Sequence, residues 1–219
     1  WIYDENSYPS GFAGGHVPDQ MPESFNQGQG LAMQRISVWP DSLSDSFFFA
    51  FERNQSDEWV LLQENPGPGQ QGDYTLVEKR FYRRGGWFGG FSYVDLLLPG
   101  VTEKFLDITM SGYEQYCGDE FGKTLPGVFT DEPNISPPGD MKWTPDLFER
   151  FKERWGYDLQ PLLPSLWLET GDWKRIRHNY YALLLELFID RWSKPWHAYC
   201  EEKGLEWTGH YWEHGWPSP

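Results

Sequence analysis

A short apolar run ends in two adjacent carboxylates and a proline at Gly127-Val128-Phe129-Thr130-Asp131-Glu132-Pro133. Buried strands are apolar and proline cannot continue a hydrogen-bonded ladder, so the run predicts a strand that leaves its sheet at Asp131 and Glu132. In α/β barrels and open α/β sheets, active sites are built at the carboxyl ends of the strands. The stretch therefore indicates two functional carboxylates at a strand end. The alternative is that both only cap the following loop.

Two other stretches have the same character. Trp1–Tyr3 leads into Asp4 and Glu5, and a strand expected at Leu205–Thr208 leads into Gly209-His210-Tyr211-Trp212-Glu213-His214. Helices are expected at about 101–117, 145–155 and 172–203, the last kinked by a proline. The alternation predicts parallel βα units in an α/β fold. A TIM-type (β/α)8 barrel is favoured over a doubly wound sheet.

About four or five βα units are recognisable, so we expect residues 1–219 to be an incomplete barrel. The missing segments are expected from a longer chain. Within it, residues 34–92 are expected to form an antiparallel β-rich insertion, with strands at 35–39, 47–53, 58–64 and 75–84. A glycine-rich loop at 85–90 closes the insertion. It either places Trp87 over a cleft or serves as a flexible hinge.

Composition limits the class of partner. The 219 residues include 33 acidic and 18 basic side chains, for a net charge of −15. This charge argues against nucleic acid or an anionic membrane as partner and fits a neutral or cationic substrate. Aromatic residues make up 18% of the chain, with 13 Trp, and the surplus suits stacking on sugar rings as well as a wide aromatic core.

Little in the sequence points to a redox role or a cellular location. Cys117 and Cys200 are too few and too far apart for a disulfide framework or a zinc site. The sequence has no long apolar run, and its first residues do not resemble a signal peptide. We therefore leave the location open.

Glu132 and Glu213 are the predicted catalytic pair, because each follows a predicted parallel strand at the same edge of the sheet. Glycoside hydrolysis uses two such carboxyl groups, one to protonate the leaving oxygen and one to activate water or attack carbon. A separation of about 5–5.5 Å favours retention and about 6.5–9.5 Å inversion. Repulsion from Asp131 is expected to raise the pKa of Glu132, as an acid requires.

His210 to His214 also match H-x-x-E-H, a zinc-protease motif that would use His210, Glu213 and His214. That motif needs a helix, whereas here a strand and a glycine precede it and Gly215 and Pro217 follow. We favour His210 as a donor to a substrate hydroxyl or as a group that orients Glu213. A structural His within the loop is the alternative.

Further acids near strand ends suit sugar hydroxyls or a Ca²⁺ ion. The chemistry itself needs no cofactor. The predicted substrate-binding residues are Asp4, Glu5, Asp131, His210, Trp87 and Trp143.

An ordered set of motifs resembles the α-L-rhamnosidases of glycoside hydrolase family 106 and their uncharacterised relatives. These motifs are Tyr3-Asp4-Glu5, Tyr8-Pro9-Ser10-Gly11, Ala13-Gly14-Gly15, Tyr93-Val94-Asp95-Leu96-Leu97, Phe129-Thr130-Asp131-Glu132-Pro133, Trp155-Gly156-Tyr157-Asp158-Leu159, and Thr208-Gly209-His210 with Glu213.

The resemblance implies a (β/α)8 catalytic domain, inverting attack on a terminal α-L-rhamnosyl unit, and calcium dependence. Glu132 matches the family's acid, and Glu213 is the candidate base. Family members are far longer, so a second carboxylate beyond Pro219 is an alternative. Asp131-Glu132-Pro133 also resembles the Asn-Glu-Pro of retaining barrel glycosidases, which keeps a retaining mechanism open. A non-catalytic carbohydrate-binding fragment is the alternative from another functional class.

Overall fold

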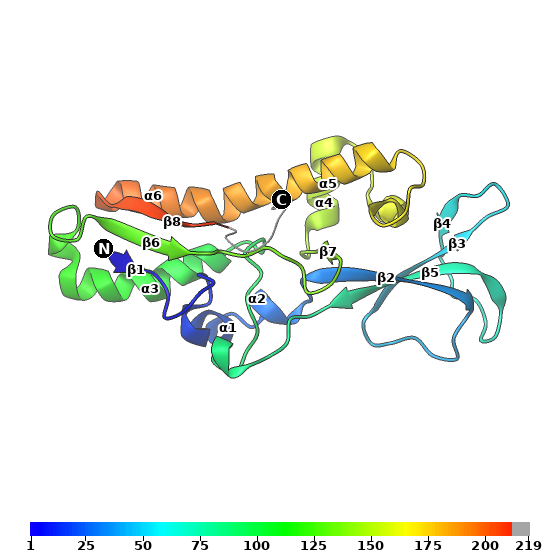
Figure 1. Cartoon of the computed structure of the whole chain (residues 1–219), viewed down its shortest axis with the longest axis horizontal. Coiled ribbons are helices and arrows are strands. Elements are labelled where there is room, and N and C mark those ends of the chain that lie inside the picture. Colours follow the sequence, from blue (N-terminus) through cyan, green and yellow to red (C-terminus); the bar gives the residue numbers. More distant parts are fainter. Residues whose placement is uncertain (212–219) are drawn as a thin grey trace. The chain divides into compact units, whose positions relative to one another are not determined.

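The computed structural model describes residues 1–211 of the chain (Figure 1). The chain forms two compact units. The parallel-sheet unit comprises Trp1–Gln27, Tyr82–Ser136 and the described part of Leu185–Pro219. The antiparallel-sheet unit comprises Gly28–Phe81 and Pro137–Leu184. No helix among the described residues is both long and apolar enough to cross a membrane.

The parallel-sheet unit is built on three strands, β1 (Ile2–Tyr3), β6 (Gly127–Asp131) and β8 (Glu206–His210), in the order β1-β6-β8. Both pairings are parallel, with Tyr3 opposite Phe129 and Asp131 opposite His210. The α/β class and the parallel pairing predicted for these strands are confirmed. A complete barrel is not formed by the described residues.

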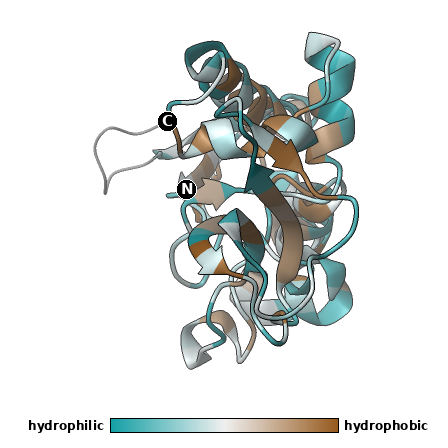
Figure 2. Ribbon diagram, turned by 90° about the vertical axis from the view of Figure 1, so that its right-hand side faces the viewer, coloured by the Kyte–Doolittle hydropathy of each residue, from teal (hydrophilic) through white to brown (hydrophobic). Residues whose placement is uncertain are grey.

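This unit contains the helices α1 (His16–Gln20), α2 (Glu23–Asn26), α3 (Val101–Cys117) and α6 (Lys194–Lys203), with short 3-10 turns at Ala13–Gly15, Gly86–Phe88 and Gly118–Glu120. Of these helices, α6 packs against β8 and α3 packs against α6. In α3, Val101, Phe105 and Met110 are fully buried. The spacing of four residues between Val101 and Phe105 places these two side chains on the same side of the helix. The helices carry both hydrophilic and hydrophobic residues along their length (Figure 2).

The long helix predicted at 172–203 consists of three segments. α5 (Trp173–Phe188) is followed by a π-helical turn at Ile189–Ser193 and then by α6. Pro195 lies in the first turn of α6, where its missing N–H is tolerated. The irregularity therefore falls just before Pro195, as a π-helical turn. The turn directs Trp192 into the core against Phe105, with ring centroids 5.8 Å apart.

The antiparallel-sheet unit contains five strands in the order β4-β3-β5-β2-β7. They are β2 (Gly30–Val38), β3 (Phe47–Arg53), β4 (Trp59–Leu61), β5 (Gln71–Arg80) and β7 (Met141–Lys142). β3 and β4 lie within the predicted strand ranges 47–53 and 58–64. β2 begins at Gly30, before the predicted region starts at residue 34, and β5 begins at Gln71, before the predicted 75–84. β7, α4 (Leu147–Trp155) and a 3-10 segment at Gln160–Leu166 belong to the same unit although they lie outside residues 34–92.

The core of this second unit is aromatic. Trp39 and Tyr74 meet edge to face with ring centroids 5.3 Å apart, and Ala50 and Leu76 are buried beside them. Burial of such apolar area contributes roughly 25 cal/mol per Å². Part of the aromatic surplus in the sequence therefore serves as core.

Candidate functional site

Three strand ends meet at one edge of the parallel sheet. The Asp4 N–H donates to the Phe129 carbonyl at 3.1 Å, and the Glu132 N–H donates to the His210 carbonyl at 3.0 Å. These bonds continue the parallel ladder one residue beyond the strands. Asp4, Glu132 and His210 are thereby fixed at the carboxyl edge, where the sequence predicted functional side chains.

Glu132 has an unusual backbone. Its φ is +48°, in the left-handed region that residues other than Gly, Asn and Asp rarely adopt. The bond to the His210 carbonyl and the buried Pro133 hold it there. Strained residues of this kind cluster at functional sites. The strained backbone therefore makes the half-buried Glu132 the first candidate for a functional residue at this edge.

The neighbouring strand can approach so closely because residue 209 is glycine. Gly209 has φ +159°, and a Cβ there would lie 1.9 Å from the Thr130 carbonyl oxygen. Any side chain would push β8 away from β6. Gly209 thus sets the position of His210 beside Asp131.

Asp131 is held by groups on both neighbouring strands. The Tyr3 hydroxyl donates to Asp131 Oδ2 at 2.6 Å, and His210 Nδ1 lies 3.6 Å from Oδ1. Burial, then the bond to Asp131, raises the pKa of Tyr3 far above its usual value, so Tyr3 remains a donor. The Phe129 ring meets the His210 ring at 5.1 Å. Ligand atoms of Asp131, Glu132 and His210 lie within 4.8 Å of one another.

Ser10 is hydrogen-bonded to the backbone of Asp131, the last residue of β6. Its Oγ donates to Asp4 Oδ1 at 2.5 Å and accepts from the Asp131 N–H at 2.8 Å. Its N–H donates to the Asp131 carbonyl at 2.7 Å, and its carbonyl accepts from the Tyr93 hydroxyl at 2.7 Å. Ser10 is fully buried, and it follows a cis peptide bond between Tyr8 and Pro9. The sequence marked Tyr8-Pro9-Ser10-Gly11 as a motif but did not predict the hydrogen bonds of Ser10.

Asp4 is almost fully buried in the wall of the cavity described below. It is 1% exposed, and Oδ2 makes no hydrogen bond of standard geometry with the described residues. Burial raises the pKa of Asp4 to about 7, although the Ser10 and Thr130 hydroxyls act in the opposite direction. Asp4 was predicted as a substrate contact, and this stays a prediction. Its carboxyl group accepts from the Ser10 hydroxyl, and the residue also lines that cavity.

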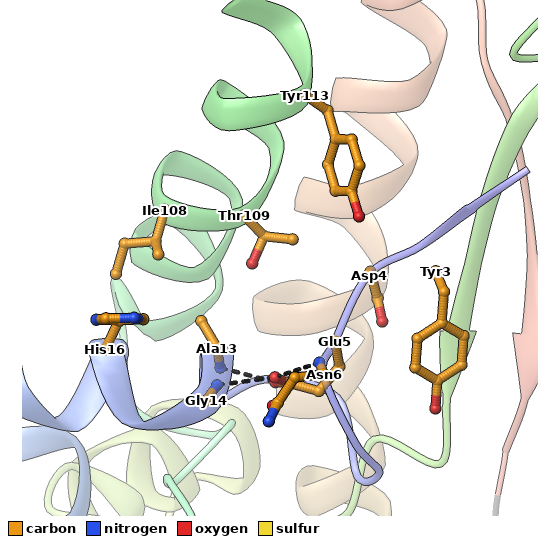
Figure 3. Close-up of a pocket in the computed structure, with 10 residues that line it drawn as sticks. All are labelled: Tyr3, Asp4, Glu5, Asn6, Ala13, Gly14, His16, Ile108, Thr109 and Tyr113. Carbon is orange, nitrogen blue, oxygen red and sulfur yellow. Dashed lines mark hydrogen bonds between the residues drawn. The ribbon is translucent and has the colours of Figure 1, made fainter. Parts of the chain in front are cut away.

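The carboxylate of Glu5 accepts four hydrogen bonds from backbone N–H groups of the loop that follows it. Its Oε1 accepts from the N–H groups of Asn6 and Gly14 at 3.0 and 2.8 Å, and its Oε2 from those of Phe12 and Ala13 at 3.1 and 2.7 Å. Figure 3 shows the bonds from Asn6, Ala13 and Gly14. Each oxygen has two acceptor positions, so these bonds occupy the carboxylate. Burial raises the pKa of Glu5, and the four bonds oppose that rise.

This loop and α3 line a cavity of about 490 Å³. Tyr113, Thr109 and Ile108 come from α3, His16 is the first residue of α1, and Asn6 comes from the loop (Figure 3). The predicted site residues Asp4 and Glu5 line the cavity as well. Tyr3 also lines the cavity.

The remaining predicted residues have different environments. Trp87 is 54% exposed in the parallel-sheet unit. Trp143 is 4% exposed in the antiparallel-sheet unit, against the Phe48 ring and the Lys79 ammonium group. Glu213 and His214 lie outside the described residues, so their position relative to Glu132 is not part of the site geometry. His210, the first residue of the H-x-x-E-H match, ends a strand.

The three clustered ligand groups do not by themselves fit Ca²⁺. This ion takes about six to eight oxygen ligands, whereas the cluster offers two carboxylates and an imidazole. Asp131 is also engaged by Tyr3 and His210. The three side chains alone therefore do not make up a calcium site, and calcium dependence stays a prediction from the resemblance.

The comparisons with known proteins are sparse. No protein-family model and no curated protein matches the chain. A solved rhamnosidase from Novosphingobium sp. PP1Y is similar at 18% identity and a TM-score of 0.48, over 76% of this chain and 16% of that chain. The chain thus spans under a fifth of that protein. The comparisons assign no family, and the functional argument depends on the residues and geometry of the strand ends.

Proposed function

We propose that this chain supplies part of the active site of a glycoside hydrolase that cleaves a terminal α-L-rhamnosyl or similar glycosidic bond. The observation that carries the proposal is the backbone of Glu132. A glutamate with φ +48° stands at the end of the central parallel strand, with Asp131 and His210 ligand atoms within 4.8 Å. The motif resemblance supports the choice of sugar. The three strands are taken as part of a (β/α)8 barrel.

In this proposal Glu132 is the general acid. Its carboxyl proton passes to the glycosidic oxygen as the bond to the anomeric carbon breaks. The neighbouring charge of Asp131 favours the protonated form of Glu132. Asp131, fixed by the Tyr3 hydroxyl, accepts a hydrogen bond from a sugar hydroxyl. His210, 53% exposed, donates one.

Glu213 is proposed as the base. It takes a proton from water, whose oxygen attacks the anomeric carbon from the face opposite the leaving group, and the configuration inverts. Glu132 leaves the reaction ionised and Glu213 protonated. Proton exchange with water restores both.

The direct test replaces Glu132 with Gln in the protein that contains this chain. We expect kcat/KM for a rhamnosyl disaccharide to fall about 10²–10⁴-fold. A smaller loss is expected for 4-nitrophenyl α-L-rhamnoside, because nitrophenolate leaves without much protonation. Glu206→Gln is the control, since Glu206 is an exposed carboxylate at the start of β8. Full activity of Glu132→Gln on both substrates would remove Glu132 from the role of acid.

The same experiment separates the alternative functional class. If the wild-type protein binds rhamnose-containing glycans but hydrolyses none of them, a non-catalytic carbohydrate-binding function replaces the proposal.

A further inference from the structure

Two half-exposed aromatic rings of the parallel-sheet unit are in contact with each other. Tyr8 is 47% and Trp87 is 54% exposed. Their ring centroids are 5.6 Å apart at an interplanar angle of 68°. Single exposed aromatic residues are common on protein surfaces. A contacting pair is more informative.

The Trp87 ring is held in place. Its Nε1–H donates to the Tyr8 carbonyl at 2.8 Å. This bond fixes the indole against the backbone of a second loop. The indole therefore offers an aromatic face with little side-chain freedom left to lose on binding.

The loop that carries Trp87 is itself anchored. Phe88 packs edge to face on the fully buried Phe12 at 5.1 Å. Gly89 has φ +65°, and a Cβ there would lie 2.5 Å from the Gly14 carbonyl oxygen, so the two loops pack backbone to backbone. The Gly85 N–H donates to the Phe91 carbonyl at 2.9 Å and closes the loop. Of the two sequence interpretations, these contacts favour a fixed platform over a hinge.

The chain connects this platform to the proposed acid. Tyr8 is two residues from Ser10, a span of at most about 7 Å between Cα atoms. Ser10 bonds the backbone of Asp131 on both its N–H and its carbonyl. The aromatic pair is thus fixed to the Asp131–Glu132 corner. Since the proposed acid contacts the leaving oxygen, we assign the aromatic pair tethered to its strand end to the leaving-group side.

We propose that Tyr8 and Trp87 form a stacking subsite for a neutral sugar ring on the leaving-group side of the bond that is cleaved. The inference rests on the proposed function for its choice of carbohydrate and for the direction of the acid. Aromatic faces suit the apolar faces of pyranose rings. The net charge of −15 disfavours anionic polymers.

The test measures equilibrium binding in a Glu132→Gln background, where turnover is suppressed. A neutral rhamnosyl disaccharide and free L-rhamnose are titrated by calorimetry. Trp87→Ala is expected to weaken disaccharide binding about tenfold and to change rhamnose binding less than twofold. Trp87→Phe is expected to recover most of the disaccharide affinity. Tyr116→Ala is the matched control, because Tyr116 is 85% exposed on the last turn of α3.

Unchanged disaccharide binding in Trp87→Ala would overturn the subsite, while the Glu132 rate measurement would still decide the proposed function. Equal weakening for both sugars would overturn the leaving-group placement. Absence of disaccharide binding to the Glu132→Gln parent would overturn the subsite as well. Thermal unfolding of each variant verifies that it is folded.

Discussion

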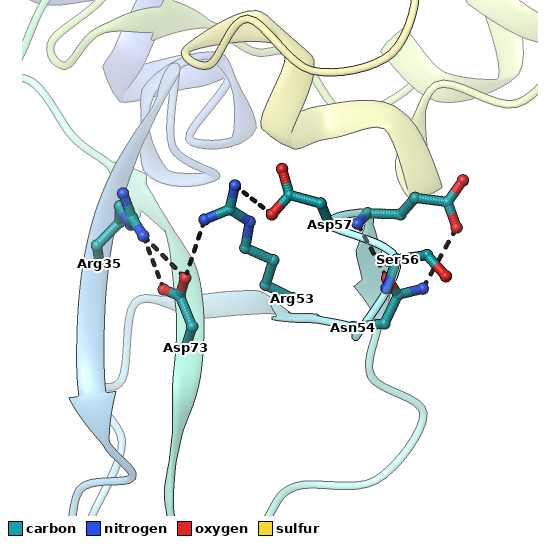
Figure 4. A network of polar contacts seen from close by, with 7 residues as sticks. Arg35, Arg53, Asn54, Ser56, Asp57 and Asp73 are labelled. Carbon is teal, nitrogen blue, oxygen red and sulfur yellow. Dashed lines mark hydrogen bonds and ion pairs between the residues drawn. The ribbon is translucent and has the colours of Figure 1, made fainter.

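The two units use carboxylates in contrasting ways. In the parallel-sheet unit, Asp4 and Glu5 are 1% and 7% exposed and accept hydrogen bonds from buried or half-buried donors. In the antiparallel-sheet unit, Asp73 bonds Arg35 at 2.9 Å and lies 3.6 Å from Arg53, and these side chains are 37–50% exposed. Figure 4 shows this exposed network. The Asp73–Arg35 contact is nearly as short as those of Asp4 and Glu5, so burial is what separates their expected energies.

The physical reason is solvent competition. Water and salt screen an exposed ion pair, which typically contributes about 0–1 kcal/mol. A buried donor or acceptor that loses its partner costs about 1–3 kcal/mol, because water cannot replace the partner. Variants of the buried carboxylates should therefore have large effects and variants of the exposed network small ones.

The largest expected effect is the pH dependence due to Asp4. Its pKa is about 7 in the folded protein against an ordinary 3.8, so the folded state binds the proton more tightly. The stability contribution is fully present below about pH 4 and is lost as the pH rises through 7. Wild type should lose on the order of 4 kcal/mol relative to Asp4→Asn over this range. Urea unfolding of both proteins at several pH values measures it.

The contributions of the other titrating groups cancel when the free energy of unfolding of the variant is subtracted from that of wild type, because both proteins contain these groups. Asparagine can still accept from the Ser10 hydroxyl, so the variant should fold. A wild-type-minus-variant difference that stays flat from pH 4 to 7.5 would show that Asp4 is not a buried acid with a raised pKa.

A somewhat smaller effect is expected for Glu5→Gln. The amide keeps one acceptor oxygen but turns its NH₂ toward two backbone N–H donors of the loop. We expect a loss of about 3 kcal/mol in the free energy of unfolding. Urea unfolding at fixed pH measures it, with Glu64→Gln in an exposed loop as the control. A loss no larger than in the control would contradict the assignment of Glu5 as the loop's anion.

What the sequence could predict in this unit was local. An apolar run that ends in Asp131, Glu132 and Pro133 predicts a strand end, and β6 ends there in the structure. The parallel pairing of these strands could also be predicted, from the alternation of strands and helices. These inferences use residues close in the chain, where patterns are informative.

The partners of the strand ends could not be predicted in the same way. Ser10 bonds Asp131 across 121 residues of sequence, and nothing in a Pro-Ser-Gly turn specifies that contact. Glu5 looked like any strand-end acid, since its four donors are backbone N–H groups without a sequence signature. The burial of Trp143 likewise depends on Phe48 and Lys79, which belong to other strands.

The smallest expected effect, and the one that completes the comparison, is that of Asp73→Asn. The change removes the charge that pairs with Arg35 and Arg53, but the arginines also lie over the Trp59 ring at 5.5 and 6.0 Å. We expect a loss of about 0.5 kcal/mol that shrinks further in 1 M salt, because the pair is screened. Urea unfolding at low and high salt measures both values. A salt-independent loss as large as that of Glu5→Gln would mean that the exposed network contributes as much as the buried one, and burial could then no longer explain the difference between the two units.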